Sequence, residues 1–538
     1  MWGPMRMHRR IRATSYDAPV RGRSVGILSV VAILAACGGA PQAAPRGTID
    51  GVVLHPPSSV VIPEDPTTTR PPRTTTSTTQ PELDLAIDWS NIGDGLEEGF
   101  LEVPLDWSDP SGDRVQLYLV RHLAERTDRR IGSLLVNPGG PGYGGSGMAY
   151  NATDIYGQDL LDRFDIVGWD PRGTGFSEPK FDCTNSIDFL TALDSSPDDD
   201  AERAALREAA GRLADDCARQ PHDELLPFMS TEDSARDMDA IRRALNEDTI
   251  SYFGFSWGSE LGATWATLFP DTVRAAVLDG AADPTVDYVQ QNVQQAAGVE
   301  GAFDVFLEQC AKRASCRFLN EGDPAGAFDD LWAKIDATPV KSPDDEHPDV
   351  TQGVLTTAIA SAMYDQAAWP ELEVALSDLQ AGNPRGILDL YDTYYGRDNG
   401  QSDDGNEAYF ATNCIDRTGL AGVEDAWAAE DDLAAAAPRL GRGWLAELLV
   451  CASWHEGPTQ PVTITGAGAP QILVVGTSDD PITPFDGSVK MAATLENGRL
   501  LSIPGRQHTG YGLSLCGDDA IERYLVDPDH ELADRTPC

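Results

Sequence analysis

Lysine is scarce in this chain: five lysines occur among 538 residues, and Lys and Arg together number 40 against 86 Asp and Glu. Six arginines precede residue 37, where Asp17 is the only acid, so the rest of the chain carries 34 basic and 85 acidic residues, a net charge of -51. Such a surface repels phosphate backbones and anionic headgroups. Because the sequence shows no compensating basic patch, we expect no nucleic-acid partner.

Long hydrophobic runs are also missing. The one extended apolar stretch, residues 25–34, is shorter than the roughly 20 residues that a membrane-spanning helix needs. It follows an arginine-rich start and ends in Leu34-Ala35-Ala36-Cys37, which resembles the bacterial lipobox. We therefore predict that residues 1–36 are a signal peptide and that Cys37 carries a lipid. The protein would be exported, either anchored to the membrane through this lipid alone or secreted. An ordinary signal peptide with a chance cysteine is the alternative.

The eight cysteines beyond Cys37 show neither C-x-x-C spacing nor an accompanying histidine cluster, so we expect no zinc site. In an exported chain their even number predicts disulfides, although eight cysteines allow about 105 pairings. Pairing each cysteine with its neighbour along the chain gives the shortest loops, which are Cys183–Cys217, Cys310–Cys316, Cys414–Cys451 and Cys516–Cys538.

Residues 37–88 are rich in Pro, Thr and Ser, which predicts a disordered linker that holds the remaining chain away from a membrane. Beyond it, apolar runs without alternation indicate strands buried on both faces, with helices between them. These runs are residues 131–136, 163–169, 249–254, 275–278, 471–475 and 499–503. Their order predicts an α/β fold with a mainly parallel sheet. Residues 286–460 have a mostly helical pattern, which predicts a large helical cap between two parts of the sheet domain, residues 89–285 and 461–538.

The segment Gly254-Phe-Ser-Trp-Gly258 follows one of these predicted strands and precedes a helix that we expect from Ser259 to Leu268. The pentapeptide G-x-S-x-G is weak evidence by itself, but between a strand and a helix it is typical of a nucleophile elbow. The flanking glycines leave room for the strained turn that exposes the serine. We therefore predict that Ser256 is a nucleophile, with a structural serine in a tight turn as the alternative.

A serine hydroxyl is a poor nucleophile unless a base takes its proton. His508 follows an apolar strand near the end of the chain, where the order Ser, Asp, His places such a base. The acid should follow the preceding strand, and Asp479 and Asp480 both stand there. It would hold the imidazole tautomer and stabilise the imidazolium. The residues alone leave both aspartates open, since an Asp before Pro also commonly forms turns.

Residues 137–147 are unusually dense in glycine and follow an early predicted strand. Backbone without side chains lets amide groups point into a site and stabilise a developing oxyanion. We predict the backbone amides of Gly140 and of Trp257, the residue after the nucleophile, as the two donors. A nucleotide-phosphate loop is the competing interpretation, but the loop is followed by neither Gly-Lys-Ser/Thr nor a clean G-x-G-x-x-G pattern. We therefore expect no cofactor and no metal.

Taken together, these motifs resemble the tripeptidyl and prolyl aminopeptidases, a family of α/β-hydrolase serine peptidases, over residues 95–538. The motifs that carry the resemblance lie at residues 137–142, 170–177, 254–258, 480–484 and 507–508. The C-terminal part, residues 451–538, is similar to the tripeptidyl-aminopeptidase-like (TAP-like) domain of secreted actinobacterial enzymes. The resemblance implies the α/β-hydrolase fold, places the acid at Asp480 and supports Gly140 as an oxyanion donor.

The resemblance also implies a substrate, a peptide with a free amino terminus. Tripeptides or single amino acids would be released through an acyl-enzyme on Ser256. Acids in the helical cap would bind the ammonium group, and Asp416 and Glu407 are the candidates. Asp170 and Arg172 would form a framework under the oxyanion loop. A carboxylesterase or lipase on the same scaffold is the main alternative, and a catalytically silent binding module is a third. The sequence indicates no oligomeric state.

Overall fold

The computed structural model describes residues 85–538 except 398–399, 417–418, 458, 531 and 534. The predicted signal peptide, the predicted lipidation site at Cys37 and nearly all of the predicted linker therefore lie outside the described residues. Within the described part of the chain, no helix combines the length and the apolar character that crossing a membrane requires.

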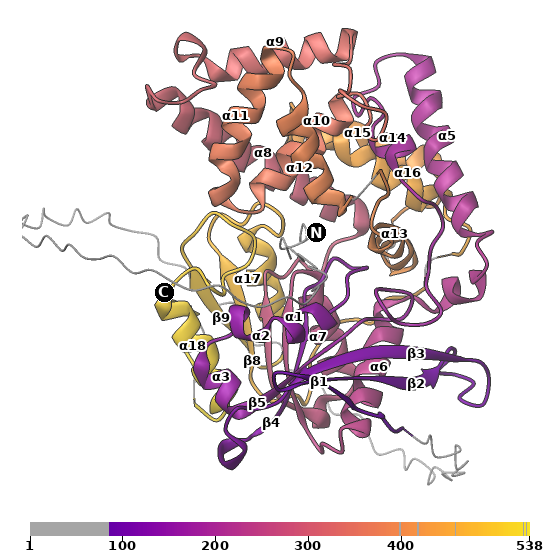
Figure 1. Ribbon diagram of the computed structural model, residues 1–538, viewed down its shortest axis with the longest axis vertical. Helices are drawn as coiled ribbons and strands as arrows, with labels where there is room; N and C mark the ends of the chain where they lie inside the picture. Colours follow the sequence, from indigo (N-terminus) through magenta and orange to yellow (C-terminus); the bar gives the residue numbers. More distant parts are fainter. Residues whose placement is uncertain (1–84, 398–399, 417–418, 458, 531, 534) are drawn as a thin grey trace, which may run out of the picture. The chain divides into compact units, whose positions relative to one another are not determined.

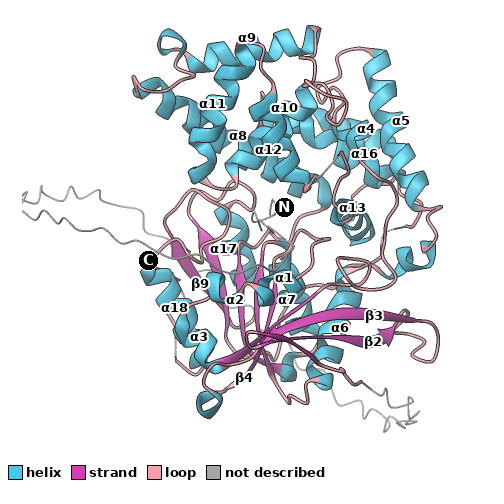
Figure 2. Cartoon of the chain, viewed as in Figure 1, coloured by secondary structure: helices cyan, strands magenta, loops and turns pink. Residues whose placement is uncertain are grey.

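A ten-stranded sheet forms the centre of the fold (Figure 2). Its spatial order is β1-β2-β3-β5-β4-β6-β7-β8-β9-β10. The strands are β1 (Ser90–Gly93), β2 (Leu96–Pro104), β3 (Arg114–His122), β4 (Gly132–Asn137), β5 (Phe164–Trp169), β6 (Ile250–Phe255), β7 (Val273–Asp279), β8 (Ile472–Thr477), β9 (Gly498–Ile503) and β10 (Arg535–Pro537). Neighbouring strands are parallel from β5 to β10, whereas β1, β2 and β3 form antiparallel pairs at one edge. The predicted α/β fold with a mainly parallel sheet is confirmed.

Burial explains which strands the sequence pattern predicts. Every residue of β4, β5, β6 and β8 is buried, as expected for parallel strands covered on both faces. The six predicted apolar runs coincide with β4 to β9. Strands β2 and β3 mix buried and exposed positions instead, because antiparallel edge strands can expose one face to water. Their pattern is the weaker signal, and the sequence analysis missed them.

Helices next to the sheet cover its two faces, and the other helices gather in a separate layer, which we call the cap (Figure 1). The helices next to the sheet are α1 (Ser146–Tyr150), α2 (Ala152–Ile155), α3 (Gln158–Arg163), α6 (Thr231–Ala244), α7 (Trp257–Leu268), α17 (Phe485–Thr494) and α18 (Leu515–Val526). The cap helices are α4 (Asp188–Thr191), α5 (Asp200–Cys217), α8 (Tyr288–Lys312), α9 (Pro324–Ala337), α10 (Gln352–Met363), α11 (Trp369–Gln380), α12 (Arg385–Tyr395), α13 (Gly405–Asp416), α14 (Val423–Ala428), α15 (Glu430–Ala436) and α16 (Leu445–Ser453).

The cap draws on two parts of the chain. Between β7 and β8, helices α8 to α16 follow one another, within the range where the sequence predicts a helical cap. Helices α4 and α5 come earlier, between β5 and β6, in a range that the sequence analysis assigned to the sheet domain. In the structure α5 packs on α16 and α4 packs on α10, so this earlier excursion belongs to the cap by its contacts.

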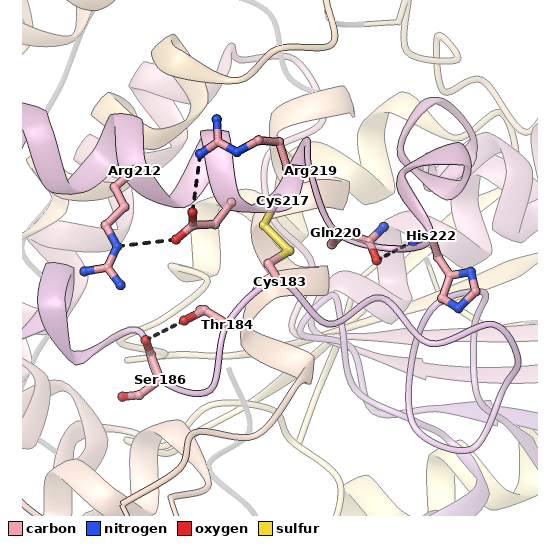
Figure 3. The surroundings of a disulfide bond; sticks show 9 residues. Cys183, Thr184, Ser186, Arg212, Cys217, Arg219, Gln220 and His222 are labelled. Atoms are coloured by element: carbon pink, nitrogen blue, oxygen red, sulfur yellow. Dashed lines mark hydrogen bonds and ion pairs between the residues drawn. A yellow bond between two sulfur atoms is a disulfide. The ribbon is translucent and has the colours of Figure 1, made fainter.

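Four disulfides join the cysteine pairs Cys183–Cys217, Cys310–Cys316, Cys414–Cys451 and Cys516–Cys538. The pairing of neighbours along the chain is confirmed. Cys183–Cys217 ties the segment after β5 to the end of α5 (Figure 3), and Cys414–Cys451 joins α13 to α16. One of these two bonds therefore cross-links the earlier part of the cap, and the other cross-links the later part.

Asp170 and Arg172, just after β5, tie this part of the sheet to its surroundings. The Asp170 carboxylate accepts the backbone N–H groups of Ser146 and Phe176. The Arg172 guanidinium forms a buried ion pair with Asp237 of α6, with Nη2 to Oδ1 at 2.7 Å and Nε to Oδ2 at 2.9 Å. Both contacts support the framework role that the resemblance implies for these residues.

Asp237→Asn should lower the free energy of unfolding by about 3–5 kcal/mol, because it removes the carboxylate that forms the buried ion pair with Arg172. Urea denaturation measures this loss. Glu232→Gln is the control on the same helix, because it breaks a half-exposed pair with Arg236 and should cost less than about 1 kcal/mol. Equal losses in the two variants would contradict the prediction.

Candidate active site

Ser256 lies on the sharp turn between β6 and α7, with φ 55° and ψ -126°. A residue with a side chain rarely adopts this conformation, and such strain is typical of a nucleophile elbow. The turn depends on its glycines, since a Cβ at Gly254 would lie 2.3 Å from the Gly258 carbonyl oxygen. The Ser256 backbone N–H donates to the Asp279 carbonyl at 2.8 Å. This hydrogen bond therefore fixes the elbow to the end of β7.

The glycine-rich loop after β4 packs directly against this elbow. A Cβ at Gly139, which has φ +90°, would lie 2.4 Å from the Phe255 carbonyl oxygen and 2.9 Å from the Trp257 backbone nitrogen. The Gly139 N–H donates to the Asn137 side-chain oxygen at 2.8 Å, which closes the loop on itself. Gly140 and Trp257 both line the cavity that contains Ser256. The two predicted oxyanion donors are thus brought together beside the serine.

His508 contacts one of the two candidate acids. Its Nδ1 lies 3.1 Å from each carboxylate oxygen of Asp480, which follows β8. The Asp480 carboxylate also accepts the backbone N–H groups of Ile482 and Thr483 at 2.9 Å, so its orientation is held. Asp479 points elsewhere and lies 3.3 Å from the Arg506 guanidinium at the surface. The structure therefore pairs His508 with Asp480.

The other imidazole nitrogen of His508, Nε2, is buried and has no hydrogen-bond partner among the residues that the structure describes. The backbone N–H of His508 donates to the Tyr364 carbonyl of the cap at 2.9 Å, and the two rings meet edge to face with centroids 5.5 Å apart. With Nδ1 bound to Asp480, Nε2 is the nitrogen that can accept a proton.

Ser256 and His508 each lie beside one of two consecutive residues at the end of β7. Asp279 accepts the Ser256 backbone N–H, and a Cβ built at the next residue, Gly280, would lie 3.2 Å from the His508 Cε1 atom. The serine, the histidine and Asp480 come from positions far apart in the chain. The ends of β6, β8 and β9 gather them because these strands are parallel and close in the sheet.

The cavity at Ser256 lies between this edge of the sheet and the cap. Residues from α8, α12, α13 and α16 line its cap side. Its lining includes three acidic side chains, Glu260, Asp283 and Glu447, and no Lys, Arg or His among the described residues. Such a lining favours a ligand with a positive charge over one with a carboxylate.

The two acids predicted to bind the substrate amine do not reach this cavity. Asp416 lies at the end of α13, where its carboxylate accepts the Thr231 backbone N–H at 2.8 Å. Glu407 is buried in the same helix, and burial raises its pKa to about 9, so it carries no charge at pH 7. Neither residue lines the cavity of Ser256. Their position in the cap was the only basis for the prediction.

Glu447 of α16, which the sequence analysis missed, does line the cavity. Its Oε2 accepts a hydrogen bond from the Tyr409 hydroxyl at 2.9 Å. Burial raises its pKa above the ordinary value, although hydrogen bonds from Tyr409 and Tyr288 oppose the shift. The available signal was a lone charged residue within the apolar run from Leu445 to Val450, since a carboxylate inside such a helix is rarely without a purpose.

The α/β-hydrolase fold family matches residues 132–322, and the TAP-like protein family matches residues 437–538. Serine protease Hip1 of Mycobacterium tuberculosis is 32% identical over 83% of this chain and 89% of its own length. The chain belongs to the TAP-like family of α/β-hydrolases. A tripeptidyl aminopeptidase of Streptomyces lividans is 31% identical to this TAP-like chain over 82% of it and 83% of the relative. Carboxylesterase B of Mycobacterium tuberculosis is 35% identical over 79% of this chain and 83% of its own length.

This TAP-like protein is therefore a serine hydrolase of the α/β fold. Its relatives include enzymes named as peptidases and one named as an esterase, so family membership alone leaves the choice between peptide and ester substrates open. That choice depends on the groups that surround the cavity.

Gly139→Ala should lower the hydrolysis rate of a chromogenic acyl ester by about 100-fold or more, because the new Cβ pushes the glycine loop away from the elbow. Gly382→Ala is the matched control, since Gly382 has φ +89° with nothing within 4 Å of its Cβ position. It shares the backbone strain without the clash, and its rate should stay near that of the native protein. Comparable losses in both variants would show that strain alone is responsible.

Proposed function

We propose that the protein is an exported serine aminopeptidase that releases tripeptides, other short peptides or single amino acids from free amino termini. In this proposal Ser256 is the nucleophile, His508 is the general base, and Asp480 is the acid that orients it. The proposal is supported by the strained elbow at Ser256, by the contact between His508 and Asp480, and by the open Nε2 of His508.

The proposed reaction has two stages, acylation and deacylation, and His508 takes up and releases a proton in each. Its Nε2 takes the Ser256 hydroxyl proton as Oγ attacks the carbonyl carbon of the scissile bond, and Asp480 stabilises the imidazolium. The imidazolium then donates the proton to the leaving amine, which departs and leaves an ester on Ser256. Water, deprotonated by the same nitrogen, attacks this ester, and the proton returns to Ser256 Oγ as the acid product leaves.

The backbone amides of Gly140 and Trp257 are the proposed donors to the oxyanion that forms in both steps. Each amide comes from backbone held by neighbouring structure, the glycine loop in one case and the first turn of α7 in the other. Donors that are already oriented need no reorganisation during the reaction, and each one contributes on the order of 3 kcal/mol to the transition state.

Glu447 is the residue that favours an aminopeptidase over an esterase in this proposal. It places a carboxylate in the same cavity as Ser256, where the described lining residues include no Lys, Arg or His to neutralise it. A substrate ammonium group would supply the missing counter-charge, and it would hold the amino terminus at a set depth from the nucleophile. A neutral acyl ester gains nothing from this carboxylate. Glu447 takes the role that the sequence analysis assigned to Asp416 and Glu407.

Carboxylesterase activity is the second candidate, because the same catalytic groups hydrolyse esters more readily than amides and one relative carries that name.

Export is supported by the N-terminal pattern of the sequence and by four disulfides, which persist in oxidising compartments. We further propose a lipid anchor at Cys37 as the only membrane contact. The mechanism uses neither a metal nor a cofactor, and we propose no nucleic-acid partner.

Ser256→Ala should abolish hydrolysis of tripeptidyl and aminoacyl chromogenic amides, since no other group in the proposed mechanism can form the acyl-enzyme. A fluorophosphonate probe should label the native protein and leave this variant unlabelled. Full activity in the variant would refute the assignment of the nucleophile. Absence of labelling in the native protein would instead favour a silent binding module.

Glu447→Gln should lower kcat/KM for peptides with a free amine by about 10- to 100-fold, the worth of a hydrogen bond to a charged group. Rates on the N-acetylated peptide and on an acyl ester should change by less than about 2-fold, because they lack the ammonium group. With the native protein, KM for the free-amine peptide should rise as pH falls through the raised pKa of Glu447, since the protonated carboxyl group no longer pairs with the ammonium.

Glu407→Gln is the control for this experiment, because it removes a buried cap carboxyl group that does not line the cavity. Its kcat/KM should match that of the native protein. If Glu447→Gln affects free and acetylated peptides equally, amine recognition by this residue is refuted. A native protein that hydrolyses only esters would favour the carboxylesterase instead.

A further inference from the structure

Asp279, the last residue of β7, holds two separate parts of the candidate active site. Its carboxylate accepts the backbone N–H groups of Gly510 and Tyr511, both at 2.8 Å. Its carbonyl oxygen accepts the Ser256 backbone N–H at 2.8 Å and the Ser259 hydroxyl at 3.0 Å. One residue therefore contacts the elbow through its backbone and the loop that begins at His508 through its side chain.

The Asp279 side chain is completely buried, and no basic side chain forms an ion pair with it in the described part of the chain. Among the described residues, the charged groups that act on it most strongly are Asp480 after β8 and Asp518 of α18. The pKa of Asp279 is raised to about 7, chiefly by burial, with the two backbone hydrogen bonds opposing the shift and the charges of Asp480 and Asp518 adding to it. A buried carboxylate without a counter-ion costs stability, and the two backbone N–H groups that it binds offset that cost.

Residues 508–511 belong to neither a helix nor a strand, so other contacts must fix the conformation of this loop. Thr509 has φ 72°, a conformation that side chains rarely adopt and that persists only where the surroundings impose it. The Asp480 carboxylate binds the first part of the loop, through His508 Nδ1 and the Thr509 N–H at 3.3 Å. The Asp279 carboxylate binds the second part.

We propose that Asp279 is a positioning residue that keeps His508 aligned with Ser256, with its carbonyl group on the elbow and its carboxylate on the loop after the histidine. This inference rests on the nucleophile and base of the proposed function, but not on the choice of a peptide substrate. In this proposal two carboxylates hold the His508 imidazole in position. Asp480 orients the ring directly, and Asp279 sets the backbone that carries it.

The carboxylate is needed because both of its oxygens accept a hydrogen bond. Asn at this position has the same size but only one acceptor oxygen, and its NH₂ group would face one of the two backbone N–H donors. Asp279→Asn therefore disturbs the loop with little change in volume. Because the Asp279 carbonyl group remains, the elbow contact with Ser256 is retained.

Asp279→Asn should lower kcat for a chromogenic acyl ester by about 10- to 100-fold, the effect of a small misplacement of a catalytic group, while KM changes by less than about 2-fold. In the native protein kcat should also fall as pH drops below the Asp279 pKa of about 7, because the protonated carboxyl group can no longer accept both N–H groups, and Asp279→Asn should lack this step. A variant that had lost only stability would keep the pH profile of the native protein.

Glu300→Gln is the matched control. Glu300 is a buried carboxylate of the cap that also accepts two backbone N–H groups, those of Arg439 and Leu440, at 3.1 and 2.9 Å. Its substitution should lower the urea midpoint to a similar extent and leave both kcat and the pH profile unchanged. If the two variants behave alike in kcat and pH profile, Asp279 has only a structural role and the inference is overturned.

The test separates this inference from the proposed function. An inactive Ser256→Ala variant together with a fully active Asp279→Asn variant would refute only the role of Asp279, whereas an active Ser256→Ala variant would refute the nucleophile itself. If Asp279→Asn does not fold, amide hydrogen exchange of the native protein decides. The amides of Gly510 and Tyr511 should exchange as slowly as those of β7, and exchange at the rate of an open loop would overturn the inference.

Discussion

The parallel alignment of β4, β6, β7 and β8 is the constraint on which the site depends. Parallel strands end at the same edge of a sheet, so each strand delivers the residue that follows it to one place. Strand β4 delivers the glycine loop, β6 delivers Ser256, β7 ends in Asp279, and β8 delivers Asp480. Strand β9, next to β8, leads to His508. Contacts between these strand ends then set the geometry of the site.

The strain at the site is held by close packing around it. Ser256 and Thr509 both have positive φ values, which cost free energy and persist because the surroundings leave no alternative. The glycine loop presses on the elbow at distances that admit no side chain at Gly139, and buried hydrogen bonds to Asp279 and Asp480 hold the turns in place. The rigid sheet therefore supports backbone conformations that an isolated loop would not keep.

The sheet and the cap make different contributions. The sheet carries the groups that break a bond, and these groups suit esters and amides alike. In the proposed function the cap carries the group that selects a substrate, because Glu447, Tyr288 and Tyr409 approach the cavity from its helices. Its disulfides, two of which fasten α5, α13 and α16, help a layer of short helices to hold these side chains in place. Substrate preference can thus change in the cap without altering the sheet.

Local patterns in the sequence determined the fold class, the six central strands, the elbow at Ser256 and the pairing of neighbouring cysteines, because burial on both faces, tight turns and short loops all leave a signature in adjacent residues. Only the tertiary structure brought Asp480, which the resemblance already favoured over Asp479, into contact with His508, moved α4 and α5 into the cap, and placed Glu447 rather than Asp416 or Glu407 in the cavity. The contacts on which the role proposed for Asp279 rests belong to the same group. These choices depend on contacts between residues hundreds of positions apart, and in a chain with 86 acidic residues composition cannot tell a carboxylate at the site from one at the surface.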